Sequence, residues 1–342
     1  MSGDGYRVGV LGATGLVGST ILELLAAREF PIAELRLLAS ARSAGKVIEW
    51  NGKALTVHEI GEDSIQDLDL VLSSAGGSVS AEWTPKIVAA GATVVDNTSY
   101  WRMKDDVPLV VSEVNPEALE GHKGIIANPN CSTMQMVVAL KPLYDEAGIE
   151  RLVVSTYQAV SGTGKAAIDE MLDQAHAILH GQEATASIYP KQIAFNALAQ
   201  AGSFKDGDDH TDEERKLINE TRKILGDPAI KVSATCIRVP VVTGHSEAVN
   251  IETREPLSPE RARDLLEAAP GVVVVDDPAA SRFPMAIEAA GRDEVFVGRI
   301  RRDAGNENAL DMWVVADNLR KGAATNAVQI GELLIERDLL RS

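Results

Sequence analysis

The feature that most constrains the fold is a glycine-rich segment near the N-terminus, residues 12–18. An apolar run typical of a buried strand precedes it at residues 6–11, and leucine and isoleucine at helical spacing follow it at residues 19–27. A strand, a glycine turn and a helix in this order direct backbone N–H groups and a helix N-terminus at a pyrophosphate. The spacing, Gly-x-x-Gly-x-x-Gly, is looser than the usual motif, so a purely structural turn is the alternative. The flanking elements favour a dinucleotide site, with candidate contacts at Gly12, Thr14, Gly15, Leu16, Val17 and Gly18.

The pattern along the chain predicts two domains of different class. In the first part, apolar strands alternate with helix-like stretches, which indicates a parallel sheet covered by helices. The expected strands are residues 35–39, 68–73 and 92–96, and the expected helix is residues 81–90. After residue 130 the pattern changes to a helix at 132–147 and longer strands at 152–160, 230–240, 245–253, 294–301 and 310–316. We expect an α/β protein: a Rossmann-type domain over 1–130, onto which a helix at 322–342 packs back, and an α+β domain with a mixed sheet over 131–321.

Composition excludes several classes of function. The 342 residues suit two domains, and 33 basic against 50 acidic residues give a net charge of −17, which repels nucleic acid. No apolar run approaches the roughly 18–20 residues that cross a bilayer, and no signal peptide is evident, so we expect a cytoplasmic protein without membrane contact. Two cysteines support neither a disulfide framework nor a zinc site, and His176 and His180, four residues apart, lack the glutamate of a zinc-protease motif. We therefore predict no metal.

Residues 40–43, Ser-Ala-Arg-Ser, follow the second predicted strand and indicate which dinucleotide binds. An NAD site would place an acidic residue there for the ribose 2′-hydroxyl, whereas Arg42 between Ser40 and Ser43 suits a 2′-phosphate. A solvated loop arginine is the alternative, but we favour NADP. Ser74 and Gly76 follow a later strand and should lie at the same carboxyl edge of the sheet, beside the cofactor.

Cys131 is the candidate nucleophile. It follows Asn-Pro-Asn, residues 128–130, and precedes a predicted helix, whose N-terminus lowers the pKa of a thiol. A core cysteine is the alternative, but the proline and asparagines argue against one; Cys236, inside an apolar run, fits that description. His245 is the best proton partner, because it begins a predicted strand shortly after Arg238 ends another, which would place both at neighbouring strand ends. A surface histidine is the alternative for His245.

Taken together, these segments resemble aspartate-β-semialdehyde dehydrogenase over nearly the whole chain. The matching segments are residues 12–18, 40–43, 96–99 with Arg102, 128–133, Gln158 with 161–164, 213–216 and 238–247. The Asn-Pro-Asn-Cys and Arg-x₆-His elements are far more discriminating than the glycines. The resemblance implies reduction of β-aspartyl phosphate by NADPH, with release of phosphate, in lysine, methionine and threonine biosynthesis.

The resemblance also implies residue roles. Cys131 would form a thioester, His245 would be the acid/base, and Gln158 and Asn130 would orient the acyl group and flank the nucleophile. Arg238 would bind the α-carboxylate of the substrate, and Glu213 would bind its α-amino group. Arg102 and Lys216 would bind the phosphate. Further cofactor contacts would be Ser161, Gly162 and Asn318. For Arg102, Glu213 and Lys216, a solvated charge run is the alternative.

The resemblance further suggests a homodimer formed through the second domain, acting on a small-molecule substrate. Two other readings compete with this one. N-acetyl-γ-glutamyl-phosphate reductase has the same domain plan and nucleophile, but its blocked amino group would leave Glu213 without a purpose. A non-catalytic NADP-binding protein would need no nucleophile, so substitution of Cys131 would leave its role intact.

Overall fold

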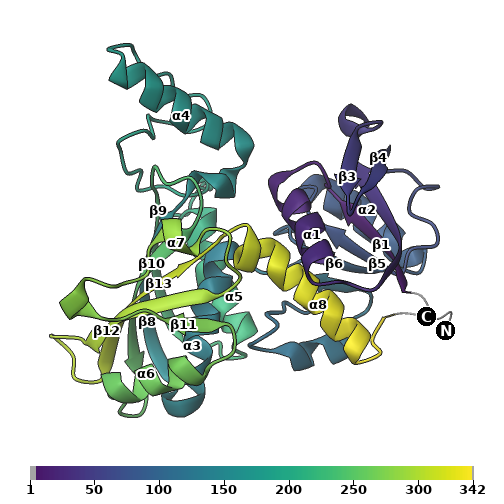
Figure 1. Cartoon of the computed structure of the whole chain (residues 1–342). Coiled ribbons are helices and arrows are strands. Elements are labelled where there is room, and N and C mark those ends of the chain that lie inside the picture. Colours follow the sequence, from purple (N-terminus) through teal and green to yellow (C-terminus); the bar gives the residue numbers. More distant parts are fainter. Residues whose placement is uncertain (1–4, 341–342) are drawn as a thin grey trace. The chain divides into compact units, whose positions relative to one another are not determined.

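A computed structural model of the chain describes residues 5–340, which form two compact units (Figure 1). The first unit contains the chain up to Asn130 together with the segment that begins at Ala323. The second unit is Cys131–Gly322. None of the helices in the described part of the chain is both long and apolar enough to span a membrane.

The first unit is built on a seven-stranded sheet in the order β3-β4-β2-β1-β5-β6-β7. All neighbouring strands are parallel except the antiparallel pair β3 and β4 at one edge. The strands are β1 (Tyr6–Leu11), β2 (Ile32–Ala39), β3 (Val47–Trp50), β4 (Lys53–Glu59), β5 (Leu70–Ser73), β6 (Thr93–Asp96) and β7 (Ile125–Ala127). A parallel sheet gathers its strand ends at one edge, which is where a ligand site is expected.

The sequence reading missed β3, β4 and the three-residue β7. Asn51-Gly52, with φ of 48° and 73°, turns the chain between β3 and β4, and an Asn-Gly pair is the strongest short-range signal for such a hairpin. Most side chains of β4 are exposed, so its apolar pattern is weak. The Asn-Gly pair was the signal that could have identified this hairpin.

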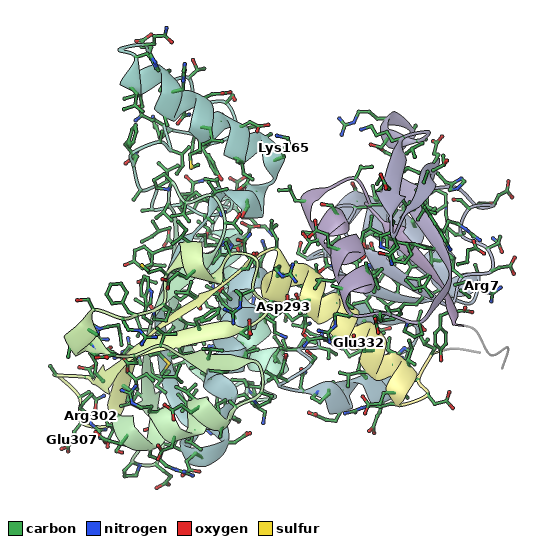
Figure 2. All side chains as sticks on the ribbon, in the orientation of Figure 1. Arg7, Lys165, Asp293, Arg302, Glu307 and Glu332 are labelled. Atoms are coloured by element: carbon green, nitrogen blue, oxygen red, sulfur yellow. The ribbon has the colours of Figure 1, made fainter. Side chains whose placement is uncertain are left out.

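Helices cover the first sheet: α1 (Leu16–Ala27), α2 (Gly77–Ala89) and α8 (Thr325–Glu336). Helix α1 begins three residues before the predicted start, because the glycine turn leads directly into it. Buried leucines of α1 pack in one core with Val328 and Leu334 of α8. Arg28 pairs at 2.6 Å with Glu332, which is labelled in Figure 2. A π-helical turn, Arg320–Ala324, precedes α8.

The second unit contains a six-stranded mixed sheet in the order β11-β12-β13-β10-β8-β9, and the predicted sheet class is confirmed. Its strands are β8 (Ile149–Gln158), β9 (Lys231–Arg238), β10 (His245–Thr253), β11 (Val272–Val274), β12 (Val295–Arg302) and β13 (Ala309–Ala316). Helices α3 (Cys131–Ala147), α5 (Asp212–Ile224) and α6 (Pro259–Ala268) pack against the sheet, and α7 (Ala286–Ala289) is a single turn. Helix α4 (Lys165–Leu179) stands away from the sheet on its own loop (Figure 1).

Candidate active site

The glycine turn of the first unit has the geometry of a phosphate cradle. Gly12 has φ of 88°, and a Cβ atom there would lie 2.6 Å from the Ser74 carbonyl oxygen. A Cβ atom on Gly18 would collide with the Gly12 carbonyl oxygen, so α1 approaches the turn closely only because residue 18 is glycine. Gly15 caps α1 without a side-chain hydrogen bond, and none of the described first-turn residues is acidic. No acidic side chain in the first turn of α1 therefore compensates the positive end of the helix dipole.

The segment after β2 lies beside this turn. The Thr14 hydroxyl donates to the Ser43 hydroxyl at 3.3 Å, which joins the glycine turn to the short 3₁₀ helix Ala41–Ser43. Ser43 is buried, whereas Arg42 is exposed and extends into solvent from the same turn. The Ser74 N–H donates to the Leu11 carbonyl, which brings the end of β5 to the same edge. The structure thus brings together the predicted cofactor contacts of the first unit.

Arg102 lies in a buried polar network at the other side of this sheet edge. Its guanidinium donates to the backbone carbonyls of Asn128 at 2.9 Å and Asn97 at 2.7 Å. The Asn128 side chain donates to the Asn97 amide oxygen at 2.6 Å and accepts from Asn326 of α8 at 2.6 Å. Asn130 is also buried. Arg102 is therefore fixed by backbone contacts and is not part of a solvated charge run.

In the second unit, three predicted residues meet at one edge of the sheet. Gln158 ends β8, Arg238 ends β9 and His245 begins β10, and all three are buried. Because β10 is antiparallel to β8, its beginning lies beside the end of β8. The expectation that Arg238 and His245 occupy neighbouring strands was wrong, because β8 lies between β9 and β10. The insertion of β8 places Gln158 between the arginine and the histidine.

The hydrogen bonds of His245 determine its tautomer. The Ala159 N–H donates to Nδ1 at 3.0 Å, so Nδ1 carries a lone pair and the ring proton is on Nε2. Burial lowers the pKa of His245 to about 3, and the nearby positive charge of Arg238 adds to this effect. Nε2 has no hydrogen-bond partner among the described residues and faces Gly162, where a Cβ atom would lie 3.2 Å away. His245 is thus a neutral side chain that presents an N–H donor.

Helix α5 places Glu213 against this edge. The helix begins with a capping box in which the side chains of Thr211 and Glu214 each accept from the other residue's backbone N–H. Glu213 is buried, accepts from Gln158 Nε2 at 3.0 Å and pairs with Lys216 Nζ at 2.8 Å. Burial alone would lower the pKa of Lys216, but Glu213 and Asp212 outweigh it and raise the pKa. These charges form an ordered pair beside Gln158, which the charge-dense sequence did not reveal.

Cys131 is the first residue of α3, so its sulfur is at the positive end of the helix dipole. One turn further along α3, Gln135 donates through Nε2 to the backbone carbonyl of His245 at 3.3 Å, which holds the start of α3 beside the start of β10. A Cβ atom on Gly322 would lie only 2.8 Å from the Cys131 Cβ. Cys236 is fully buried in β9, where burial raises its pKa, so the prediction of a core cysteine is confirmed.

Ser161 and Asn318 form a second buried contact near His245. The Asn318 amide donates to the Ser161 hydroxyl at 2.9 Å, and the Asn318 oxygen accepts from the Gly244 N–H at 2.9 Å. Asn318 therefore connects the turn that carries Gly162 with the residue before His245. Both side chains are almost completely buried.

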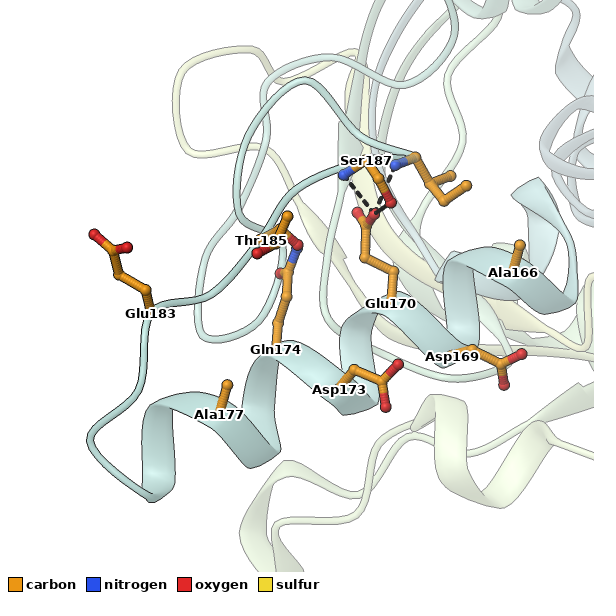
Figure 3. Close-up of a pocket in the computed structure, with 10 residues that line it drawn as sticks. Ala166, Asp169, Glu170, Asp173, Gln174, Ala177, Glu183, Thr185 and Ser187 are labelled. Carbon is orange, nitrogen blue, oxygen red and sulfur yellow. Dashed lines mark hydrogen bonds between the residues drawn. The ribbon is translucent and has the colours of Figure 1, made fainter.

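A pocket of about 470 Å³ lies beside α4 (Figure 3). Its carboxylates come from Asp169, Glu170, Asp173 and Glu183. The Glu170 carboxylate accepts from the Ser187 and Ile188 N–H groups at 2.7 and 2.6 Å, so it holds the loop over the helix. None of the predicted catalytic or cofactor residues lines this pocket.

Comparison with known proteins agrees with this arrangement. Residues 7–122 match the family model of the semialdehyde dehydrogenase NAD-binding domain, and residues 140–321 match that of the semialdehyde dehydrogenase dimerisation domain. Both halves of the chain are therefore of the semialdehyde dehydrogenase class.

Curated relatives show which family of this class the chain is similar to. The chain is 57% identical to aspartate-semialdehyde dehydrogenase of Aquifex aeolicus, over 98% of this chain and 100% of the relative. It is 53% identical to the enzyme of the same name from Legionella pneumophila, over 98% and 97%. The chain belongs to the aspartate-semialdehyde dehydrogenase family, and the resemblance seen in the sequence is confirmed.

Solved structures give the same result. A complex of aspartate semialdehyde dehydrogenase II from Vibrio cholerae with ASA superimposes with a TM-score of 0.95 at 50% identity, covering 98% of this chain and 99% of that one. Aspartate semialdehyde dehydrogenase with NADP from Candida albicans has a TM-score of 0.74 at 29% identity, covering 98% and 99%.

Proposed function

We propose that this protein catalyses the NADPH-dependent reductive dephosphorylation of L-4-aspartyl phosphate to L-aspartate 4-semialdehyde and phosphate. The observation that carries the proposal is the sheet edge of the second unit, where Gln158, Arg238 and His245 lie beside the start of α3 with Cys131. The reaction serves lysine, methionine, threonine and diaminopimelate biosynthesis.

The first unit supplies the residues for the cofactor. The glycine turn and the N-terminus of α1 suit the pyrophosphate, because the close approach at Gly12 and Gly18 leaves no room for side chains. The exposed Arg42, on the turn joined to Thr14 through Ser43, suits a 2′-phosphate and so favours NADP over NAD. Bound NADPH would supply the hydride. The NADP complex of the Candida albicans relative supports this choice.

Cys131 would act as the nucleophile. Its thiolate, favoured by the α3 dipole, attacks the acyl carbon; the new carbon–sulfur bond forms as the bond to the phosphate oxygen breaks and phosphate leaves. The thioester on Cys131 would be the group that accepts the hydride, and the carbon–sulfur bond would then break to release the aldehyde, with its electron pair returning to the Cys131 sulfur. The Nε2–H of His245 would donate a hydrogen bond to the oxygen that gains charge. The predicted acid/base is thus proposed as a donor in the resting state.

The remaining side chains would recognise the charges of the substrate. Arg238 has Nη1 bound to the Ala159 carbonyl at 2.7 Å, but its buried Nε has no partner in the described chain, so that edge can meet a carboxylate. Glu213, held by Gln158 and Lys216, would accept from the substrate ammonium group. Lys216 and Arg102 would meet the phosphate. Gln158, fixed by Glu213, would orient the acyl group.

Exposed apolar side chains on the second unit support the proposal of a homodimer. A pocket of about 470 Å³ on this unit is lined by Phe283, Met285 and Trp313 together with Arg299 and Arg301. Phe283 and Met285 are among the exposed large apolar side chains, and such a patch on a soluble domain indicates an interface. The family model that matches this unit is described as a dimerisation domain. Light scattering should give twice the chain mass, and Met285→Glu should lower it; a monomeric wild type would refute the dimer.

The assay in the reverse direction tests the proposed function. Purified protein should reduce NADP with aspartate semialdehyde, and the rate should require phosphate. N-acetylglutamate semialdehyde is the matched alternative substrate, because it lacks the free ammonium group proposed to meet Glu213. Activity with the acetylated substrate alone would overturn the assignment, and activity with neither would point to a non-catalytic NADP-binding protein.

A further inference from the structure

One buried acid beside the proposed active site has no part in this mechanism. Glu247, the third residue of β10, is fully buried between Thr156 of β8 and Val314 of β13. Neither of its carboxyl oxygens has a hydrogen-bond partner in the described part of the chain. A buried polar group without a partner is rare and calls for an explanation.

The groups around Glu247 come from three elements. His245 lies two residues away on the same strand, so both side chains face α3. From α3, Gln135 is fully buried; its Nε2 donates to the His245 carbonyl, and its Oε1 has no partner among the described residues. From β9, the Cys236 side chain shares this face. The titratable neighbours, His245 and Cys236, are both uncharged at neutral pH.

An ionised carboxylate would be costly in this position because none of the described residues compensates it with a positive charge. Burial raises the pKa of Glu247 well above its ordinary value, and the Gln135 amide offsets only part of this effect. Burial therefore favours the protonated form of Glu247. The Gln135 amide lies within reach of the Glu247 carboxyl group, because it acts on the pKa of that group, and the Gln135 Oε1 has no partner among the described residues. A protonated carboxyl group has one O–H donor, which this oxygen could accept.

We propose that Glu247 is a positioning residue that acts as an uncharged carboxylic acid, and that its pairing with Gln135 holds α3 against β10. Cys131 and Gln135 lie one turn apart on α3, and His245 and Glu247 lie one step apart on one face of β10. The pairing thus fixes the position of Cys131 relative to His245. Its meaning for catalysis rests on the proposed function.

Infrared spectroscopy tests the charge state of Glu247 without an activity assay. The infrared difference spectrum between wild type and Glu247→Gln at neutral pH should contain the C=O stretch of a protonated carboxylic acid. Glu252→Gln, on the same strand, is the matched control and should not remove that band. A carboxylate signal in its place would overturn the proposal.

The positioning role is tested with two substitutions. Glu247→Gln keeps the size and the uncharged pairing, so kcat should stay within about threefold of wild type and the pH profile should not move. Glu247→Met keeps the volume but removes the pairing, so kcat should fall by about tenfold or more with KM within about threefold. A Gln variant as impaired as the Met variant would contradict the proposal, as would a fully active Met variant.

The rate at which iodoacetamide labels Cys131 separates this proposal from the proposed function. Labelling needs no substrate. Its rate should change by at least about threefold in Glu247→Met but not in Glu247→Gln. If neither semialdehyde is a substrate, the proposed function fails while the labelling and infrared results still test the pair. If Glu247→Met does not fold, the infrared band and the Gln variant decide the question.

Discussion

The buried neutral histidine makes a prediction that can be worked in numbers. The ordinary pKa of histidine is 6.5, and burial together with Arg238 lowers that of His245 to about 3. A histidine whose pKa is lower in the folded protein binds more protons in the unfolded chain. The free energy of unfolding therefore falls as the pH drops below 6.5. At pH 5.5 the imidazole of His245 is about 90% protonated in the unfolded chain and neutral in the folded protein. This difference lowers the free energy of unfolding by about 1.4 kcal/mol.

Urea unfolding of wild type and His245→Gln at pH 7.5 and 5.5 measures this effect. Between these two pH values, the wild type should lose about 1.4 kcal/mol more unfolding free energy than the variant, because glutamine does not titrate. His176→Gln, which removes an exposed histidine from α4, is the matched control and should keep the wild-type dependence. Equal losses in wild type and His245→Gln would refute a buried neutral histidine, and with it the Nε2–H tautomer.

Three further substitutions test separate parts of the site. Cys131→Ala should abolish turnover while NADPH still binds by fluorescence titration, and retained turnover would exclude the covalent mechanism. Arg42→Ala should raise KM for NADPH about tenfold or more with little change in kcat, unlike Lys53→Ala; equal KM values in the two variants would remove the 2′-phosphate contact. Gly162→Ala would put a methyl group 3.2 Å from His245 Nε2, so kcat/KM should fall about tenfold with little loss of stability. Gly121→Ala, which meets open space, should leave kcat/KM unchanged, and an equal effect of both glycine variants would contradict this packing.

Much of the fold could be predicted because its signals are local. The central strands of the first sheet are short and largely apolar, and β1 and β10 have the predicted bounds. The edge hairpin of β3 and β4 was missed because most of its side chains are half-buried or exposed, which weakens the periodicity. The order of strands in the second sheet was also beyond the sequence, because it depends on pairings between residues far apart in the chain.

By itself, the sequence determined the chemical inventory: a glycine turn between strand and helix, an arginine where NAD enzymes carry an acid, and a cysteine at a helix start. These are properties of neighbouring residues, and family resemblance extends them over the whole chain. The tertiary structure alone decided the states of the side chains. It made His245 a neutral donor through Ala159 and turned Glu213 from a residue in a charged run into the partner of Gln158. It also buried Glu247 with no hydrogen-bond partner among the residues that the structure describes. Protonation depends on burial and on contacts made across the fold, and no local sequence pattern records either.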